Sequence, residues 1–64
     1  MAGYYRDLKN LLKDGGCTFV REGKGDHEIW FSPITNRHFT LDRGVTSRPT
    51  ANGTLKDAGL PKAF

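Results

Sequence analysis

The sequence predicts an α+β fold, a two-layer α-β-β-β-α sandwich in which a three-stranded antiparallel sheet carries both helices on one face. Three observations predict it. A leucine-rich segment with helical spacing opens the chain, three short aromatic and β-branched runs joined by tight turns follow, and a second helical pattern lies near the end. A sheet this small must bury one face under both helices, which leaves the other face open.

The first helix is predicted over residues 4–14, YYRDLKNLLKD. Apolar side chains recur there at helical spacing, and polar ones occupy the opposite side. The apolar set is Tyr4 or Tyr5, Leu8, Leu11 and Leu12. Gly15 and Gly16 end the helix, because glycine adopts the left-handed cap conformation without steric cost.

Three strands follow, over residues 17–22, 27–32 and 37–42. The segment GKGD turns the chain between the first two strands, and residues 33–36, which include a proline and an asparagine, turn it between the last two. Two tight turns between three strands predict an antiparallel meander.

The second helix is predicted to begin after Ser47, an N-cap residue, with Pro49 tolerated in the first turn. Its apolar face is formed by Ala51, Leu55 and Ala58. The segment GLP at residues 59–61 is typical of a helix cap followed by a stop.

Length and composition limit the class of protein. The chain has 64 residues, so residues 1–64 form a single domain, and a core of this size supports only a shallow site. The single Cys17 excludes an internal disulfide and a cysteine-based metal site, and it fits a reducing compartment. No apolar run approaches the length of a membrane span, and no signal peptide is recognisable. We therefore expect a cytoplasmic protein without a membrane partner.

The charge distribution favours a polyanionic partner. Net charge is +3 and the sequence pI is about 9.4. Five cations lie in the middle of the chain, near strand ends and loops: Arg21, Lys24, Arg37, Arg43 and Arg48. A basic stripe of this kind is typical of nucleic-acid binding, although small proteins are also often basic for solubility alone.

Alternation along the middle strand places His27, Ile29 and Phe31 on one face and Trp30 on the other. A small core needs its largest apolar side chain, so we expect Trp30 to point inward. Ile29 and Phe31 would then form an apolar patch beside His27, and such patches often mark a partner interface. The alternative is that Ile29 and Phe31 belong to the core and Trp30 is only half covered.

His27 is the candidate catalytic residue. An imidazole titrates near neutral pH and can transfer protons, although a lone histidine at the start of a strand is by default a solvated residue without a task. Lys24 and Arg21 could hold a phosphate near it, and Gly25 lets a ligand approach the backbone. RNA cleavage needs this combination of proton transfer and positive charge.

His38 is a weaker candidate for the site. It either contacts a phosphate or is simply an exposed surface residue. Ten residues separate His27 from His38 and no cysteine pair accompanies them, so the sequence shows no zinc pattern. We expect neither a metal nor a cofactor.

The segments KDGG, GKGDHEIWFSP and SRPTANGTLKDAGL, taken together, resemble the HicA (YcfA-like) family of toxin–antitoxin systems. The resemblance extends from about Tyr5 to Leu60. It implies a fold similar to the double-stranded-RNA-binding domain, a ribosome-independent mRNA endonuclease (mRNA interferase) that arrests growth, and neutralisation by a HicB-type antitoxin. It assigns the catalytic role to His27 and the turn glycine to Gly25.

Two features depart from the family pattern. Asp26 and Glu28 flank His27, where they would attract protons to the imidazole and repel phosphate. Pro49 stands where a histidine is common in the family, so the RNA contact that the resemblance implies at the start of the second helix does not carry over to this chain. Arg48, beside it, is a candidate RNA contact on its charge alone.

Two other functions stay open. A non-catalytic RNA-binding module of the same fold would bind RNA without cutting it, although such modules usually carry a lysine cluster where this chain has only Arg48. A protein-interaction domain would use Ile29 and Phe31 and be indifferent to RNA. The fold alone does not decide between them.

Overall fold

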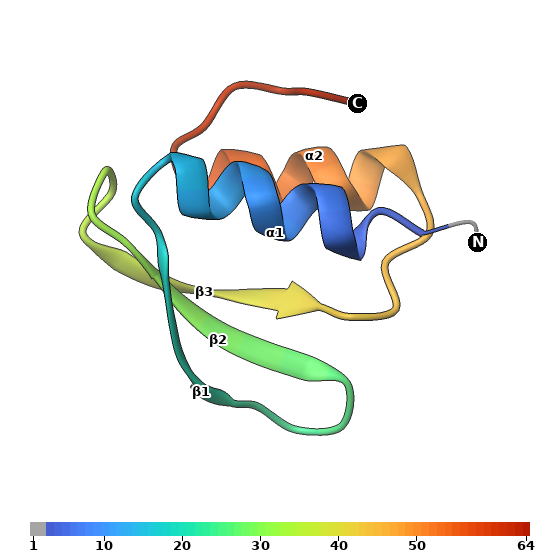
Figure 1. Ribbon diagram of the computed structural model, residues 1–64, viewed down its shortest axis with the longest axis horizontal. Coiled ribbons are helices and arrows are strands. Elements are labelled where there is room, and N and C mark those ends of the chain that lie inside the picture. The colour runs from blue at the N-terminus through green and yellow to red at the C-terminus, as the bar shows by residue number, and fades with distance from the viewer. Residues whose placement is uncertain (1–2) are drawn as a thin grey trace.

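The computed structural model describes residues 3–64 and shows a small α+β domain with an open sheet (Figure 1). The elements, in chain order, are α1 (Tyr5–Asp14), β1 (Thr18–Glu22), β2 (His27–Ser32), β3 (Arg37–Asp42) and α2 (Arg48–Asp57). The strands form one antiparallel sheet in the order β1-β2-β3. The predicted α-β-β-β-α architecture is therefore confirmed.

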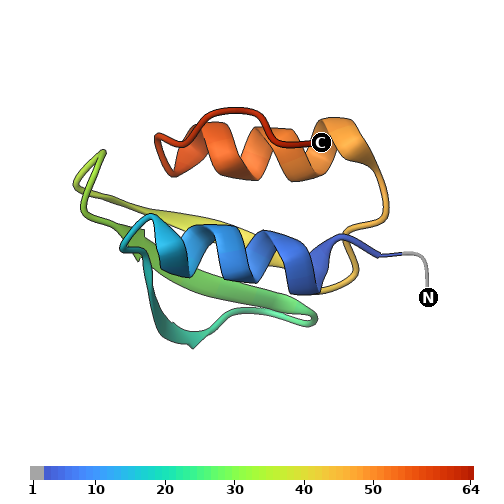
Figure 2. The ribbon, with the colours of Figure 1, turned by 45° about the horizontal axis from the view of Figure 1, so that its top comes forward.

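Both helices lie side by side on one face of the sheet (Figure 2). The core between the two layers is formed by Leu8, Leu12, Cys17, Trp30, Phe39, Leu41, Val45, Ala51, Leu55 and Ala58. The molecule is only 16 Å across its shortest axis, which leaves no depth for an enclosed substrate cavity.

The first strand begins one residue later than predicted, because the cap of α1 extends to Cys17. Gly16 has a φ of 90°, as the glycine cap requires. The N–H of Cys17 then donates to the carbonyl of Leu12, so Cys17 still belongs to the helix cap. The first strand consequently begins at Thr18 instead of residue 17.

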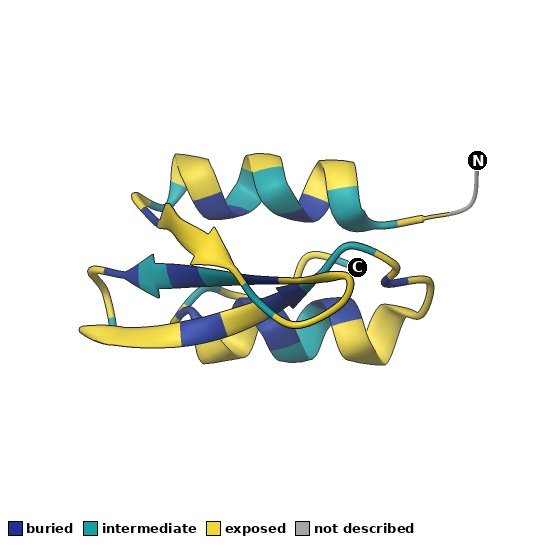
Figure 3. Cartoon of the chain, turned by 90° about the horizontal axis from the view of Figure 1, so that it is seen from below, coloured by how far each residue is buried: buried dark blue, intermediate teal, exposed yellow. Residues whose placement is uncertain are grey.

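The register of β2 confirms the inward position of Trp30, which is only 1% exposed. Trp30 pairs with Phe39 of β3, whereas Ile29 pairs with Thr40 on the opposite face. Buried and less buried residues alternate along β2, as Figure 3 shows with the sheet in front of the helices. The alternative arrangement, with Trp30 half covered, is wrong.

A β-bulge interrupts β1 at Val20. Phe19 pairs with Trp30, but the next paired residue, Arg21, pairs with Ile29. Two residues of β1 therefore correspond to one residue of β2. The bulge places Arg21 opposite Ile29, on the open face, where an unbroken register would put it opposite Glu28.

The second helix forms as predicted. The Ser47 side chain accepts a hydrogen bond from the N–H of Thr50, and Ala51, Leu55 and Ala58 are buried. After α2 the chain returns along the helices (Figures 1 and 2), where the Asn52 side chain bonds the backbone of Phe64. The Phe64 ring meets Tyr4 edge to face at 5.0 Å.

Within residues 3–64, the structure contains no helix that is both long enough and apolar enough to cross a bilayer.

Candidate functional site

The open face of the sheet brings together most of the residues that the sequence singled out. Strand pairing aligns His27 with Asp42, Ile29 with Thr40 and Phe31 with His38. The bulge adds Arg21 beside Ile29. Candidate catalytic, RNA-binding and partner-contacting residues thus share one surface.

His27 begins β2 directly after the turn at residues 23–26. Its backbone is held on both sides, since its carbonyl accepts from Gly23 at 2.8 Å and its N–H donates to the Lys24 carbonyl at 3.2 Å. Gly25 has a φ of 64°, a conformation that favours glycine, and no heavy atom lies within 4 Å of the position that a Cβ would take there. The turn therefore fixes the main chain of His27 and leaves the space around Gly25 open to a ligand.

The imidazole of His27 is exposed. Among residues 3–64, no side chain forms a hydrogen bond or ion pair with it. Asp42, its cross-strand neighbour, directs its Oδ1 to the N–H of Gly44 at 2.8 Å. The imidazole is thus accessible to a substrate, and its orientation is not imposed by a protein partner.

Glu28 does not lie beside the imidazole, contrary to the expectation from the sequence. It belongs to the face of β2 that packs under the helices and is only 5% exposed. Alternation sends its side chain to the side of the sheet opposite His27. Of the two acids that flank His27 in sequence, only Asp26, in the exposed turn, stays near the open end of the site.

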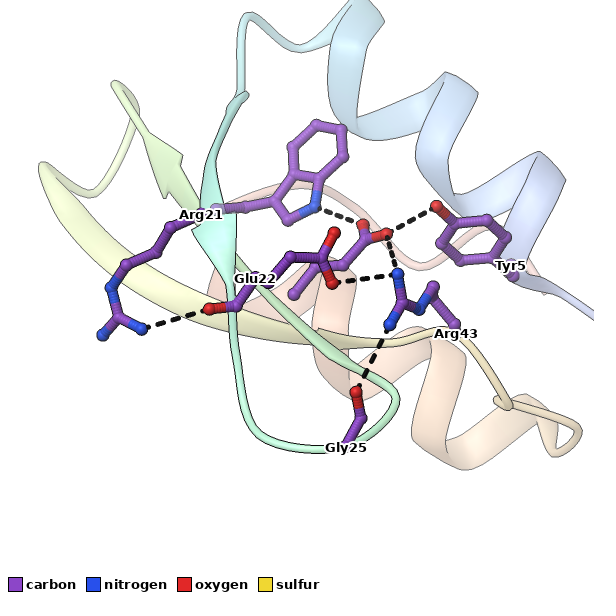
Figure 4. Close-up of polar contacts among 7 residues, drawn as sticks. Tyr5, Arg21, Glu22, Gly25 and Arg43 are labelled. Carbon is purple, nitrogen blue, oxygen red and sulfur yellow. Dashed lines mark hydrogen bonds and ion pairs between the residues drawn. The ribbon is translucent and has the colours of Figure 1, made fainter.

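The Glu28 carboxylate forms the centre of a buried polar cluster with three partners (Figure 4). The Tyr5 hydroxyl donates to Oε2 at 2.8 Å, and the Trp30 indole N–H donates to Oε1 at 2.9 Å. Arg43 lies 3.5 Å from Oε2. These contacts offset the cost of burying the charge, which would otherwise be several kcal/mol.

Arg43 connects this cluster to the turn that carries His27. Its guanidinium pairs with Glu22 at 3.0 Å and donates to the carbonyl of Gly25 at 3.3 Å, and its backbone N–H donates to the carbonyl of Asp26 at 2.9 Å. Arg43 therefore holds the hairpin in place from the loop after β3. Its guanidinium is therefore engaged within the molecule by two carboxylates and a backbone carbonyl.

The cluster also changes the acidity of Tyr5. Burial raises the pKa of the Tyr5 hydroxyl, and the hydrogen bond to the negatively charged Glu28 raises it further. Tyr5 consequently remains a neutral donor to Glu28 throughout the physiological pH range.

His38 lies on the same face as His27 but at the other end of the strands. It pairs with Phe31, four residues along β2 from His27, which corresponds to a separation of about 13 Å. The Phe31 and His38 rings meet edge to face at 5.1 Å. The two histidines are too far apart to act on one bond.

The remaining predicted RNA contacts occupy different positions. Lys24 is exposed in the turn before His27. Arg48 is exposed at the start of α2, which lies at the same end of the molecule as this turn but in the helical layer (Figure 1). Arg37 begins β3 at the end that carries His38.

The sequence interpretation missed two features. Within residues 3–64 the large apolar residues that are exposed are Phe19, Val20 and Ile34, whereas Ile29 and Phe31 are only half-exposed. The Glu28–Arg43 contact was also missed, although alternation places Glu28 beside Trp30 and a buried acid requires a cation. Across residues 3–64, no group of three or more histidine, cysteine or acidic side chains is arranged to hold a metal ion.

Comparison of the chain with protein-family models, curated proteins and solved structures finds no match. What this site can do is therefore inferred from its own residues.

Proposed function

We propose that this protein is an endoribonuclease that cleaves mRNA with His27 as its catalytic residue. The observation that carries the proposal is the position of His27. Its main chain is fixed at the start of β2 by a glycine-containing turn, and its exposed imidazole lies on the face that also carries Arg21, three residues after the exposed Lys24.

The proposed reaction is an attack of the RNA 2′-hydroxyl on the neighbouring phosphorus. His27 takes the proton of the 2′-hydroxyl as the new bond between O2′ and phosphorus forms. The bond between phosphorus and the 5′-oxygen breaks, and the proton goes to that leaving oxygen. Lys24 and Arg21 stabilise the negative charge that builds on the non-bridging oxygens.

The biological role that we propose is that of a HicA-type toxin in a type II toxin–antitoxin system. The resemblance of three sequence segments to that family and the matching order of helices and strands support this role. Growth arrest through mRNA cleavage and a cytoplasmic location belong to the same proposal. A HicB-type antitoxin would cover His27 and contact the half-exposed Ile29 and Phe31.

The decisive test replaces His27 with alanine and with asparagine. Loss of general acid–base catalysis lowers the cleavage rate by roughly 10²- to 10⁴-fold, so expression of either variant should restore growth and leave total mRNA intact. Both variants should fold and bind RNA as the wild type does, because the exposed imidazole makes no contact with the core. Circular dichroism and an RNA-binding assay check this.

An active His27→Ala protein would remove His27 from the mechanism. A variant that loses activity only because it unfolds would assign His27 a structural role. Co-expression of a HicB-type antitoxin with the wild type tests the partner, and the exposure of His27 should fall in that complex.

A non-catalytic RNA-binding module is the second candidate. The distance between the two histidines favours it, since His38 lies about 13 Å from His27 and cannot serve as a second imidazole for the same bond. Under this reading purified wild-type protein binds RNA but leaves it uncut, and His27→Ala changes nothing.

A further inference from the structure

The open face has a shallow hollow between its strands. This hollow has a volume of about 360 Å³ and is lined by Val20, Arg21, Ile29, His38, Phe39 and Thr40. The β-bulge is what brings Arg21 to it. One side of the hollow is therefore cationic, and its floor is apolar.

A second hollow lies at β3, between this strand and the end of α2. It measures about 720 Å³, and it shares His38, Phe39 and Thr40 with the first. Arg37 and Lys56 line its far side, together with one acid, Asp57. We call these two hollows together the sheet track; Arg21 lines the first, and Arg37 and Lys56 line the second.

An aromatic pair lies beside this sheet track. His38 is exposed, and its ring meets that of Phe31 edge to face. In such a pair the edge of one ring points at the face of the other, so both faces of the first ring stay free of its partner. A further planar group can stack on one of these faces. Aromatic side chains on an open sheet, flanked by cations, are the arrangement on which proteins stack unpaired bases.

We propose that the sheet track binds single-stranded RNA, with one base stacked on the Phe31–His38 pair and the adjoining phosphates held by Arg21, Arg37 and Lys56. This inference rests on the proposed function, because His27 then acts on the same strand about 13 Å away. A duplex does not fit, since its bases are stacked on one another and cannot lie on side chains.

Charge favours RNA over a protein as the occupant. The sheet track carries three cations, Arg21, Arg37 and Lys56, against the single acid Asp57. Asp42 is the acid on the open face beyond it, beside His27. The apolar side chains of the face, Ile29 and Phe31, are half-exposed, which suits contact with one base better than a broad apolar interface.

The test measures binding in the His27→Ala background, so that no strand is cut. The probe is a labelled RNA of about 12 unpaired nucleotides, and the same strand annealed to its complement is the duplex probe. Phe31→Leu keeps an apolar side chain but removes the aromatic face, and His38→Ala removes its neighbour. Phe19→Leu is the matched control, because Phe19 is also an exposed aromatic residue but packs against Trp30 on the helix side of the sheet.

We expect Phe31→Leu and His38→Ala each to weaken binding of the single strand by about 5- to 150-fold. Phe19→Leu should leave this affinity unchanged, and the duplex should bind more weakly than the single strand. Thermal melting by circular dichroism verifies that each variant is folded. Unchanged affinity in both folded variants, or equal losses for single strand and duplex, would overturn the proposal.

The two proposals fail in different ways. If the wild type cuts RNA and Phe31→Leu binds RNA equally well, the stacking site is refuted and the nuclease proposal stands. If the wild type never cuts RNA but its binding depends on Phe31 and His38, the nuclease proposal is refuted and the stacking site stands. Binding of a protein partner with no affinity for RNA refutes both.

Discussion

Glu28 links the hairpin of β1 and β2 to α1 and to the loop after β3. Its carboxylate accepts hydrogen bonds from Tyr5 of α1 and Trp30 of β2, and it lies close to Arg43 from the loop after β3. A buried charge tolerates few arrangements, because loss of any one partner leaves an uncompensated group. The position of the turn before His27 therefore depends on residues distant in sequence.

Tyr5→Phe tests this cluster at the level of one hydrogen bond. The change removes a hydroxyl bonded to a charged acceptor and should lower the free energy of unfolding by about 1–2 kcal/mol at neutral pH. Urea unfolding of the wild type and the variant measures the difference. Tyr4→Phe is the matched control, since no hydrogen bond of the Tyr4 hydroxyl occurs within residues 3–64.

The pH dependence of this difference has a definite sign. The pKa of Tyr5 is raised in the folded protein, so the neutral hydroxyl is the favoured form. The contribution of Tyr5 is therefore complete below its ordinary pKa of about 10, and it is lost as pH rises through that value toward the raised one. If the difference in the free energy of unfolding between wild type and Tyr5→Phe stays constant or grows as pH rises above the raised pKa, the role assigned to Tyr5 is contradicted.

Among the elements, β2 and α2 are joined by a compact contact at one end of the molecule. The Ser32 hydroxyl donates to the carbonyl of Ala58 at 2.6 Å. Gly59 has a φ of 80°, and a Cβ at this position would lie 2.7 Å from Ile34 and 2.9 Å from Thr35. The turn between β2 and β3 thus packs directly on the end of α2.

Gly59→Ala should destabilise the protein by at least about 1–2 kcal/mol, because it combines a left-handed backbone with a steric clash. Gly53→Ala is the matched control of opposite sign. Gly53 lies inside α2 with nothing within 4 Å of a Cβ, so alanine there should stabilise the protein by about 0.5–1 kcal/mol. Thermal melting of both variants checks the pair, and a neutral Gly59→Ala would show that the end of α2 adapts.

For the molecule as a whole, charge is divided between the two layers. Arg21 lies on the open face, Lys24 projects from the turn before His27, and Arg48 begins α2. Arg43 is neutralised within the protein by Glu22 and Glu28. The positive charges behind the net charge of +3 are therefore spread over separate parts of the surface.

Salt dependence measures how many of these cations contact RNA. The affinity for a single strand should fall by roughly 0.7 decades per decade of salt for each phosphate contacted, over about 50 to 200 mM salt. Lys24→Ala and Arg48→Ala should each reduce this slope by about one contact. Lys62→Ala is the control, since Lys62 lies in the segment after α2. A flat response in the wild type would eliminate phosphate binding as a source of affinity.

The sequence by itself determined the local structure. Leucine spacing and a glycine pair define α1, glycine and proline turns separate the strands, and Ser47 begins α2, because periodicity and caps act over a few residues. It also determined that Trp30 and Ile29 lie on opposite faces of β2, whereas the inward position of Trp30 was an expectation that the structure confirmed.

Only the tertiary structure decided which residues meet across the sheet. The bulge at Val20 moves Arg21 to the open face, the β2–β3 register separates His27 from His38, and the Glu28–Arg43 contact joins two elements. Strand register and bulges arise from pairing between distant segments and leave no periodic signal in either strand alone. The open face of this protein was therefore decided by how its strands pair, while the strands themselves could be predicted from the sequence.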